Sequence, residues 1–383
     1  MANTITNLIP YLYEAMDVVS RELIGFIPAV TRNSSAERAA LNEQINVPVV
    51  PAIATSNITP GATAPNDGDA SFGNITLTIS KSKYAPVRWN GEEMKAVGLT
   101  NIRENVITLQ FAQAMRALCN EVESDLANVA YQGASRAYGT PGTAPFGTAA
   151  DLTDGAQLRK ILDDNGAPQT DLQLVLGTSA MANIRGKQSV LFKVNESGTD
   201  QLLRLGIIGE LQGFNLHSSG QVKTPTKGTG ASYTSNTAGY AVGATDITLI
   251  TGTGTVLAGD VVTFAGDTNK YVVKTGVAAP GVISLQAPGL LVALAASAVA
   301  MTVGNTATQN VGFSKSSIAL VTRAPAMPEG GDSADDVLEL VDPLSGLAFQ
   351  IAMYKQYRQV RYEVGLAWGQ SMVAGRHAAN LLG

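Results

Sequence analysis

The feature that most constrains this chain is one long helical pattern at residues 101–132. Its apolar positions recur at helical spacing: Met115, Cys119, Val122, Leu126 and Val129. Asn101 with Glu104 three positions later is a capping-box pattern, which marks where the helix begins. At 1.5 Å per residue, this helix is roughly 45 Å long. It can therefore be the spine of a whole subunit.

The charged residues of this stretch lie largely off the apolar stripe. They are Arg116, Glu121, Glu123 and Asp125. We expect them to be ordinary solvated charges. Cys119 lies on the stripe, so we expect a buried thiol. As the one cysteine of the chain it cannot form an internal disulfide, and it fits a reducing compartment.

A strand pair near the C-terminus, residues 347–369, has the length to pack along such a helix. Apolar residues alternate on its first half: Leu347, Phe349, Ile351 and Met353. They alternate again on its second half: Val360, Tyr362, Val364, Leu366 and Trp368. Arg361 and Glu363 face the other way. The pattern predicts two long antiparallel strands with one buried face.

Residues 46–91 are extended and have no core of their own. "NVPVVPAIA" is strand-like, a loop rich in Gly, Pro and Asp follows, and "NITLTIS" alternates strictly. We expect "KYAPVRWNG" to return along it and to end in an Asn-Gly turn. An isolated two-stranded ribbon is marginal in water. The predicted hairpin must therefore lie against another surface, and its candidate contacts with another subunit are Ile75, Leu77, Ile79, Lys81, Lys83, Arg88 and Trp89.

The other parts follow in a clear order. Residues 10–30 predict an amphipathic helix closed by Pro28, and a link at 31–44 follows it. Residues 150–222 read as a compact α/β unit with helices at 154–166 and 200–211. From 223 to 310, short strands separated by glycine turns predict a small antiparallel barrel or sandwich. It interrupts an α/β unit that resumes near residue 311.

The composition and the motifs of the chain offer few residues of the types used in catalysis. Of 383 residues, 45% are hydrophobic and 15% charged, which indicates a well-buried globular protein. A net charge of −5 without basic clusters weighs against tight, sequence-specific nucleic-acid binding. The two histidines, His217 and His377, have no partner pattern for a metal site or a triad. We expect no enzyme activity, no cofactor and no metal; His217 should be a partly buried strand residue and His377 a surface residue.

The sequence offers no clear membrane or export signal. The apolar stretch 289–304 is shorter than the roughly 20 residues that a spanning helix needs. The first residues carry Glu14 and Asp17 within their apolar part, which is not typical of a secretory signal.

The order of these parts resembles the major capsid proteins of tailed bacteriophages. Residues 203–222, "LRLGIIGELQGFNLHSSGQV", look like the central-domain segment of that family, and 347–369 look like its closing peripheral strands. Residues 244–266, "ATDITLITGTGTVLAGDVVTFAG", resemble the accessory domain inserted in coat proteins of the short-tailed enterobacterial type.

The resemblance implies the α+β fold of tailed-phage and herpesvirus major capsid proteins, with an inserted β-barrel. On that mapping the parts are an N-terminal arm and helix (1–45), an extended loop (46–91), a peripheral domain (92–149 with 335–383), an axial domain (150–222 with 311–334) and the inserted barrel (223–310).

The resemblance also implies a function. The chain would form hexamers and pentamers of an icosahedral virion capsid around packaged double-stranded DNA. It would assemble in the host bacterial cytoplasm with a scaffolding protein and a portal protein, contact DNA without sequence preference, and involve no membrane. Some capsids of this fold link Lys to Asn covalently, but the type with an insertion is not expected to do so.

Other functions stay open at this point. A bacterial nanocompartment shell shares the fold, and a phage tail or decoration protein is a further alternative. A carbohydrate-active or surface protein with the barrel as a binding module is another. Against the last, residues 228–310 offer three Asp and no Glu, which is a small supply for sugar chemistry.

Overall fold

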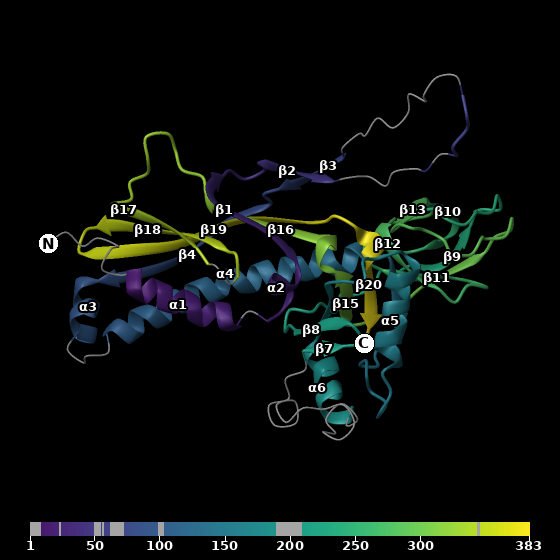
Figure 1. Ribbon diagram of the computed structural model, residues 1–383, viewed down its shortest axis with the longest axis horizontal. Helices are drawn as coiled ribbons and strands as arrows, with labels where there is room; N and C mark the ends of the chain where they lie inside the picture. Colours follow the sequence, from purple (N-terminus) through teal and green to yellow (C-terminus); the bar gives the residue numbers. More distant parts are fainter. Residues whose placement is uncertain are drawn as a thin grey trace.

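The computed structural model describes residues 9–22, 24–49, 55, 57–61, 73–98, 103–188, 209–342 and 345–383. Figure 1 shows an elongated molecule organised around one long helix, with a sheet along it, a second sheet across its end and a barrel beyond that sheet. The predicted α+β class with an inserted antiparallel barrel is confirmed.

The spine helix α4 (Arg103–Gly133) confirms the dominant sequence pattern. Met115, Cys119, Val122 and Leu126 are buried as expected, whereas Val129 is half-buried. The predicted cap at Asn101 lies outside the described residues. The expectation that its acidic residues are solvated is wrong for Glu123 and Asp125, which are 5% and 8% exposed. Because α4 is covered by helices on one side and strands on the other, its buried surface is wider than one stripe.

The N-terminal segment differs from the prediction of one helix closed by Pro28. Helix α1 (Ile9–Glu22) ends earlier, and a short second helix, α2 (Phe26–Ala29), contains Pro28. Both pack on α4. Proline fits within the first turn of α2, where its missing N–H is not needed.

The predicted link after residue 30 is instead a strand. β1 (Thr31–Ala39) pairs in parallel with β16 (Ile318–Pro325). Its sequence lacks apolar alternation, and a partner distant in the sequence supplies its hydrogen bonds. The Arg323 guanidinium also donates to the Asn33 backbone carbonyl, at 2.9 Å.

A six-stranded sheet lies along the spine helix. Its order is β1, β16, β19 (Gln359–Met372), β18 (Ala348–Gln356) and β17 (Asp336–Val341), and β4 (Lys81–Asn90) also pairs with β19. The predicted C-terminal strand pair is thus confirmed. It packs on α4, where the Phe111 and Tyr362 rings meet edge to face with centroids 5.6 Å apart.

The long hairpin predicted at 46–91 is wrong in its pairing. β3 (Gly73–Thr78) pairs antiparallel with β2 (Gln44–Val49), while β4 joins the large sheet through β19. The Asn-Gly turn is also wrong: Asn90 caps α3 (Gly91–Gly98), where the Asn90 Oδ1 accepts from the Glu93 N–H and the Glu93 Oε2 accepts from the Asn90 N–H. Residues 90–93 therefore form a capping box at the start of a helix and not a hairpin turn. No hairpin turn is needed there, because β4 pairs with β19 and not with β3.

A second sheet crosses the end of α4. Its strands are β5 (Arg136–Gly139), β20 (Ala378–Leu382), β15 (Gln309–Ser314), β6 (Leu172–Leu176), β8 (Phe214–Ser218) and β7 (Glu210–Leu211). Helices α5 (Thr153–Asp164) and α6 (Thr178–Lys187) flank it, and η3 (Lys315–Ser317) and η4 (Gly375–His377) are single turns. The predicted α/β unit is confirmed. The helix expected at 200–211 lies mostly outside the described residues, and its last residues form β7.

The inserted barrel is closed and has its own core. Its strands are β9 (Ala231–Ser235), β10 (Asp246–Thr253), β11 (Val261–Phe264), β12 (Lys270–Thr275), β13 (Val282–Leu285) and β14 (Ala300–Val303). Pairing of β11 with both β14 and β12 closes the ring. β12 also pairs with β5, which fixes the barrel to the second sheet.

The apolar stretch 289–304 belongs to this barrel and contains β14. Among the described helices, none combines the length and hydropathy needed to cross a bilayer.

Candidate assembly site at the base of the ribbon

The two-stranded sheet formed by β2 and β3, called the ribbon below, leaves the body at one defined place. The Ile79 N–H donates to the Glu43 carbonyl at 3.0 Å, and the Ser80 N–H donates to the Trp368 carbonyl at 3.0 Å. A Cβ at Gly369 would lie 2.1 Å from the Thr78 carbonyl oxygen. The ribbon therefore crosses β19 at a backbone-to-backbone contact that only glycine permits.

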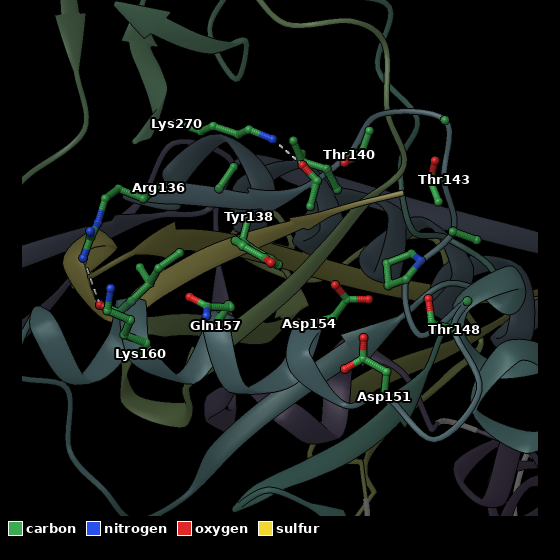
Figure 2. Close-up of a pocket in the computed structure, with 18 of the residues that line it drawn as sticks. Arg136, Tyr138, Thr140, Thr143, Thr148, Asp151, Asp154, Gln157, Lys160 and Lys270 are labelled. Atoms are coloured by element: carbon green, nitrogen blue, oxygen red, sulfur yellow. Dashed lines mark hydrogen bonds between the residues drawn. The ribbon is translucent and has the colours of Figure 1, made fainter. Parts of the chain in front are cut away.

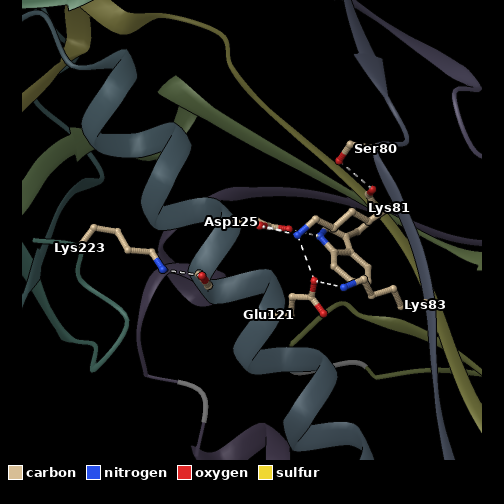
Figure 3. Close-up of polar contacts among 8 residues, drawn as sticks. Ser80, Lys81, Lys83, Glu121, Asp125 and Lys223 are labelled. Atoms are coloured by element: carbon tan, nitrogen blue, oxygen red, sulfur yellow. Dashed lines mark hydrogen bonds and ion pairs between the residues drawn. The ribbon is translucent and has the colours of Figure 1, made fainter. Parts of the chain in front are cut away.

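A polar cluster lies directly beside this crossing (Figure 3). The Lys81 ammonium is 2.8 Å from the Asp125 Oδ1 and 3.0 Å from the Glu121 Oε1, and the Lys83 ammonium is 2.5 Å from the same Glu121 oxygen. The Trp368 Nε1–H donates to the Asp125 Oδ2 at 3.0 Å. These five residues, called the base cluster, join β4, α4 and β19.

Two members of the base cluster, Lys81 and Glu121, have pKa values shifted in the direction that favours their charged forms. Burial alone would lower the pKa of Lys81, but hydrogen bonds to Asp125 and Glu121 outweigh it and raise that pKa. Burial would likewise raise the pKa of Glu121, but the two lysines outweigh it and hold that pKa below its usual value. The ion pairs of the cluster hold the start of β4 on α4. Because β4 directly follows the ribbon in the sequence, they also fix where the ribbon leaves the body.

The residues predicted as subunit contacts fall into two groups. Leu77, Ile79 and Trp89 are buried within the chain. The expected uncovered stripe is therefore wrong at the base of the ribbon, because Leu77 and Ile79 pack on Val321 and Ala367 of the large sheet. Ile75 is half-buried, and Lys83 and Arg88 are exposed, as a contact with another molecule requires. Lys81 is half-buried and held in the base cluster.

Sequence reasoning missed the acidic side of α4. Glu121 and Asp125 are one helical turn apart and so share a face. That spacing is a visible signal, but no local pattern shows that lysines of β4 lie opposite. Only the pairing of β4 with β19 brings Lys81 and Lys83 to this face.

Glu123 forms a second anchor on α4, for the N-terminal segment. Its two oxygens accept from the backbone N–H groups of Phe26 and Ile27 at 2.8 and 2.7 Å, and the Ser219 hydroxyl donates to it at 3.3 Å. A Cβ at Gly25 would lie 2.6 Å from the Glu123 Oε2. Burial raises the pKa of Glu123, while these hydrogen bonds oppose the rise.

A cavity of about 890 Å³ lies between α5, β5 and the turn before β12 (Figure 2). Its carboxylates already have partners: the Asp154 Oδ2 accepts from the Phe146 N–H at 2.7 Å, and Asp151 accepts from the Thr153 N–H at 2.9 Å. The residues that line it include no His, Cys, Ser or Glu. The hydrogen bonds of these two carboxylates join neither of them to a lysine of the cavity.

Among the described residues, neither histidine makes a hydrogen bond to the carboxylates of α4 that form the two anchors. His217 on β8 is half-buried, with ring nitrogens 3.2 Å from the Ile24 carbonyl and 2.7 Å from the Gln173 Oε1, which confirms a partly buried strand residue. His377 is half-buried rather than a surface residue, and its Nε2 atom is buried. In the described part of the chain, no three His, Cys, Asp or Glu side chains are arranged to hold a metal ion.

Comparisons with known proteins give matches at the level of structure. No protein-family model matches the sequence, and no curated protein sequence matches it. The chain is similar to a solved structure from Mycobacterium phage Che8, at 14% identity and TM-score 0.44, over 89% of this chain and 84% of that one. It is similar to the capsid structure of cyanophage P-SCSP1u, at 10% identity and TM-score 0.48, over 92% and 86%.

A third similar structure is the asymmetric unit of the mature capsid of bacteriophage PhiM1. Its identity is 10% and its TM-score 0.42, over 93% of this chain and 85% of that chain.

Proposed function

We propose that this chain is a major capsid protein that assembles through hexamers and pentamers into an icosahedral shell around double-stranded DNA. The observation that carries the proposal is the ribbon. β2 and β3 pair with each other alone in the described structure, and both lie above the body rather than within either large sheet (Figure 1).

Beyond its base, the described part of the ribbon is largely uncovered by its own chain. Asn46, Asn74 and Thr76 are exposed, and so are all described residues of 55–61, with Ile58 at 99%. A two-stranded sheet of this kind is marginal in water unless it packs on something. Since the body covers its base only, a neighbouring subunit is the surface that completes it.

The rest of the molecule suits a shell subunit. The spine helix and the long sheet hold the ribbon base in one orientation, and a closed barrel beyond the second sheet adds a second projecting unit (Figure 1). In this proposal, the parts of the chain correspond to the arm, the extended loop, and the peripheral, axial and inserted domains of a capsid subunit. The inserted barrel favours the short-tailed phage type.

The proposal includes further partners and a place of assembly. A scaffolding protein and a portal protein would act during assembly in the host bacterial cytoplasm, and the shell would contact DNA without sequence preference. Ile75 and Arg88 are the predicted contacts that remain available to a neighbour, and Lys83 is exposed while its ammonium pairs with Glu121. Lys81, Leu77, Ile79 and Trp89 would act by holding the ribbon in place.

Electron microscopy of the purified chain tests the proposal, both alone and after co-expression with a scaffolding protein. Closed round particles of uniform diameter are the expected result. Discrete small oligomers or monomers under both conditions would contradict it. A variant lacking residues 50–72, the segment that joins β2 to β3 in the sequence, is a second test: it should abolish particles while leaving the body folded.

A further inference from the structure

The end of the molecule opposite the barrel, called the tip below, carries a prominent aromatic knob. The turn Tyr357–Arg358 joins β18 to β19, whose last paired residues are Gln356 and Gln359. Tyr357 is 89% exposed, and the Arg358 guanidinium lies 5.9 Å from the centre of its ring. Tyr and Arg are the residue types most often found to dominate binding energy at protein interfaces.

A groove of about 740 Å³ lies beside the knob, between this turn and the start of α3. The Gly91 N–H donates to the Arg358 carbonyl at 3.1 Å, which fixes the two walls relative to each other. Met94 and Val360 give the groove apolar lining. Tyr357 is not among the residues that line it, so the knob of a chain does not fill the groove of the same chain.

The tip also carries exposed charges of both signs. Glu92 on α3 and Arg358 on the turn both line the groove and are both exposed. Within the described residues, neither has an ion-pair partner. A surface that presents an acid and a base side by side is complementary to a rotated copy of itself.

We propose that the tip docks on the tip of a second copy of this chain, with Tyr357 of one copy entering the groove of the next and Arg358 of one facing Glu92 of the other. Knob and groove lie at one end of the molecule, so a rotation axis beside that end brings each knob to the next groove and closes the ring. This inference rests on the proposed shell function and adds a second contact to it, remote from the ribbon.

Charge exchange tests the contact. Glu92→Arg and Arg358→Glu each place like charges across the contact, and each should lower the yield of closed particles at least ten-fold. The double variant restores opposite charges and should recover most of the wild-type yield. Tyr357→Ala should lower the yield as well. Lys274→Glu, an exposed charge reversal on the barrel, is the matched control and should assemble normally.

Each outcome has a distinct meaning. Folding is checked by tryptophan fluorescence, because both tryptophans are buried. Normal particles from both single charge variants, or failure of the folded double variant to recover, would overturn the tip contact and leave the shell function intact. If the wild-type chain forms only small oligomers, the shell function fails; the same variants then decide whether the tip holds those oligomers together. A monomeric wild-type chain overturns both.

Discussion

At the scale of single residues, buried carboxylates on the spine helix, and not its apolar stripe alone, determine how other segments pack on it. Glu123 replaces the missing intrahelical partners of α2 by accepting two of its first N–H groups. A helix of four residues has too few internal bonds to be stable by itself. This one side chain therefore fixes how the N-terminal segment enters the fold.

We expect Glu123→Gln to destabilise the chain by about 1–3 kcal/mol, because an amide group would face a buried N–H donor. Urea unfolding followed by tryptophan fluorescence measures the change. Glu14→Gln, on an exposed position of α1, is the matched control and should change stability by less than about 0.5 kcal/mol. Equal effects of the two substitutions would show that Glu123 is no anchor.

Gly369 is the second residue on which the fold depends. We expect Gly369→Ala to destabilise the protein by at least about 2 kcal/mol, or to move the ribbon, since the new Cβ would meet the Thr78 carbonyl at 2.1 Å. Backbone atoms on both sides leave no flexible group to give way. Gly186→Ala is the control: no atom lies within 4 Å of its Cβ, so a helical alanine should stabilise α6 slightly. Unchanged stability of the Gly369 variant would refute the close crossing.

At the scale of elements, the base cluster determines how the ribbon is held. The carboxyl of Glu121 has a lowered pKa, so its contribution is present above pH 4.5 and is lost as pH falls through the lowered value. Lys81 has a raised pKa, so its contribution is fully present below pH 10.5 and is lost as pH rises through the raised value. The ion pairs between β4 and α4 therefore act across the whole interval between these limits.

We expect Lys81→Met to lower stability at neutral pH by about 1 kcal/mol, a small value because the lysine side chain is 35% exposed and solvent screens the pair. The difference from the wild type should shrink at strongly acidic and strongly alkaline pH. Urea midpoints measured across the pH range provide the test, with Lys274→Met as control. A difference that does not depend on pH would mean that packing, rather than charge, holds β4.

Elements with strong local patterns could be predicted from the sequence, whereas their partners could not. The spine helix, the β18–β19 pair and the barrel strands each have an apolar periodicity that can be recognised in the local sequence alone. Strand β1 has none, and it forms because β16 offers a parallel edge. The partner of β3 was misassigned because "KYAPVRWNG" is nearest in sequence, while β2 and β19 supply the actual pairings.

The candidate site was predicted in part for the same reason. The sequence places Lys81 and Lys83 on the predicted hairpin, but both lie on β4, which belongs to the six-stranded sheet rather than to the ribbon. The sequence predicts their carboxylate partners as solvated, because a single helix pattern shows spacing but not what packs on each face. Burial of Leu77 and Ile79 depends equally on β16 and β19, which lie more than 200 residues away in the chain.

At the scale of the whole molecule, each large hydrophobic core is buried within one chain, whereas the ribbon and the tip present surfaces that their own chain does not cover. The body, the second sheet and the barrel each bury their own apolar residues. The uncovered surfaces lie at places far apart on the elongated molecule. Such a distribution suits a subunit that touches several neighbours rather than one that forms a single closed pair.

Hydrogen exchange of the ribbon tests the central claim most directly. The amides of residues 44–49 and 73–78 are compared in assembled particles and in dissociated subunits, with β18 and β19 as an internal reference. We expect slow exchange of the ribbon in particles and fast exchange in free subunits, while the reference strands stay protected in both. Equal, strong protection of the ribbon in the free subunit would contradict the claim that a neighbouring copy completes it.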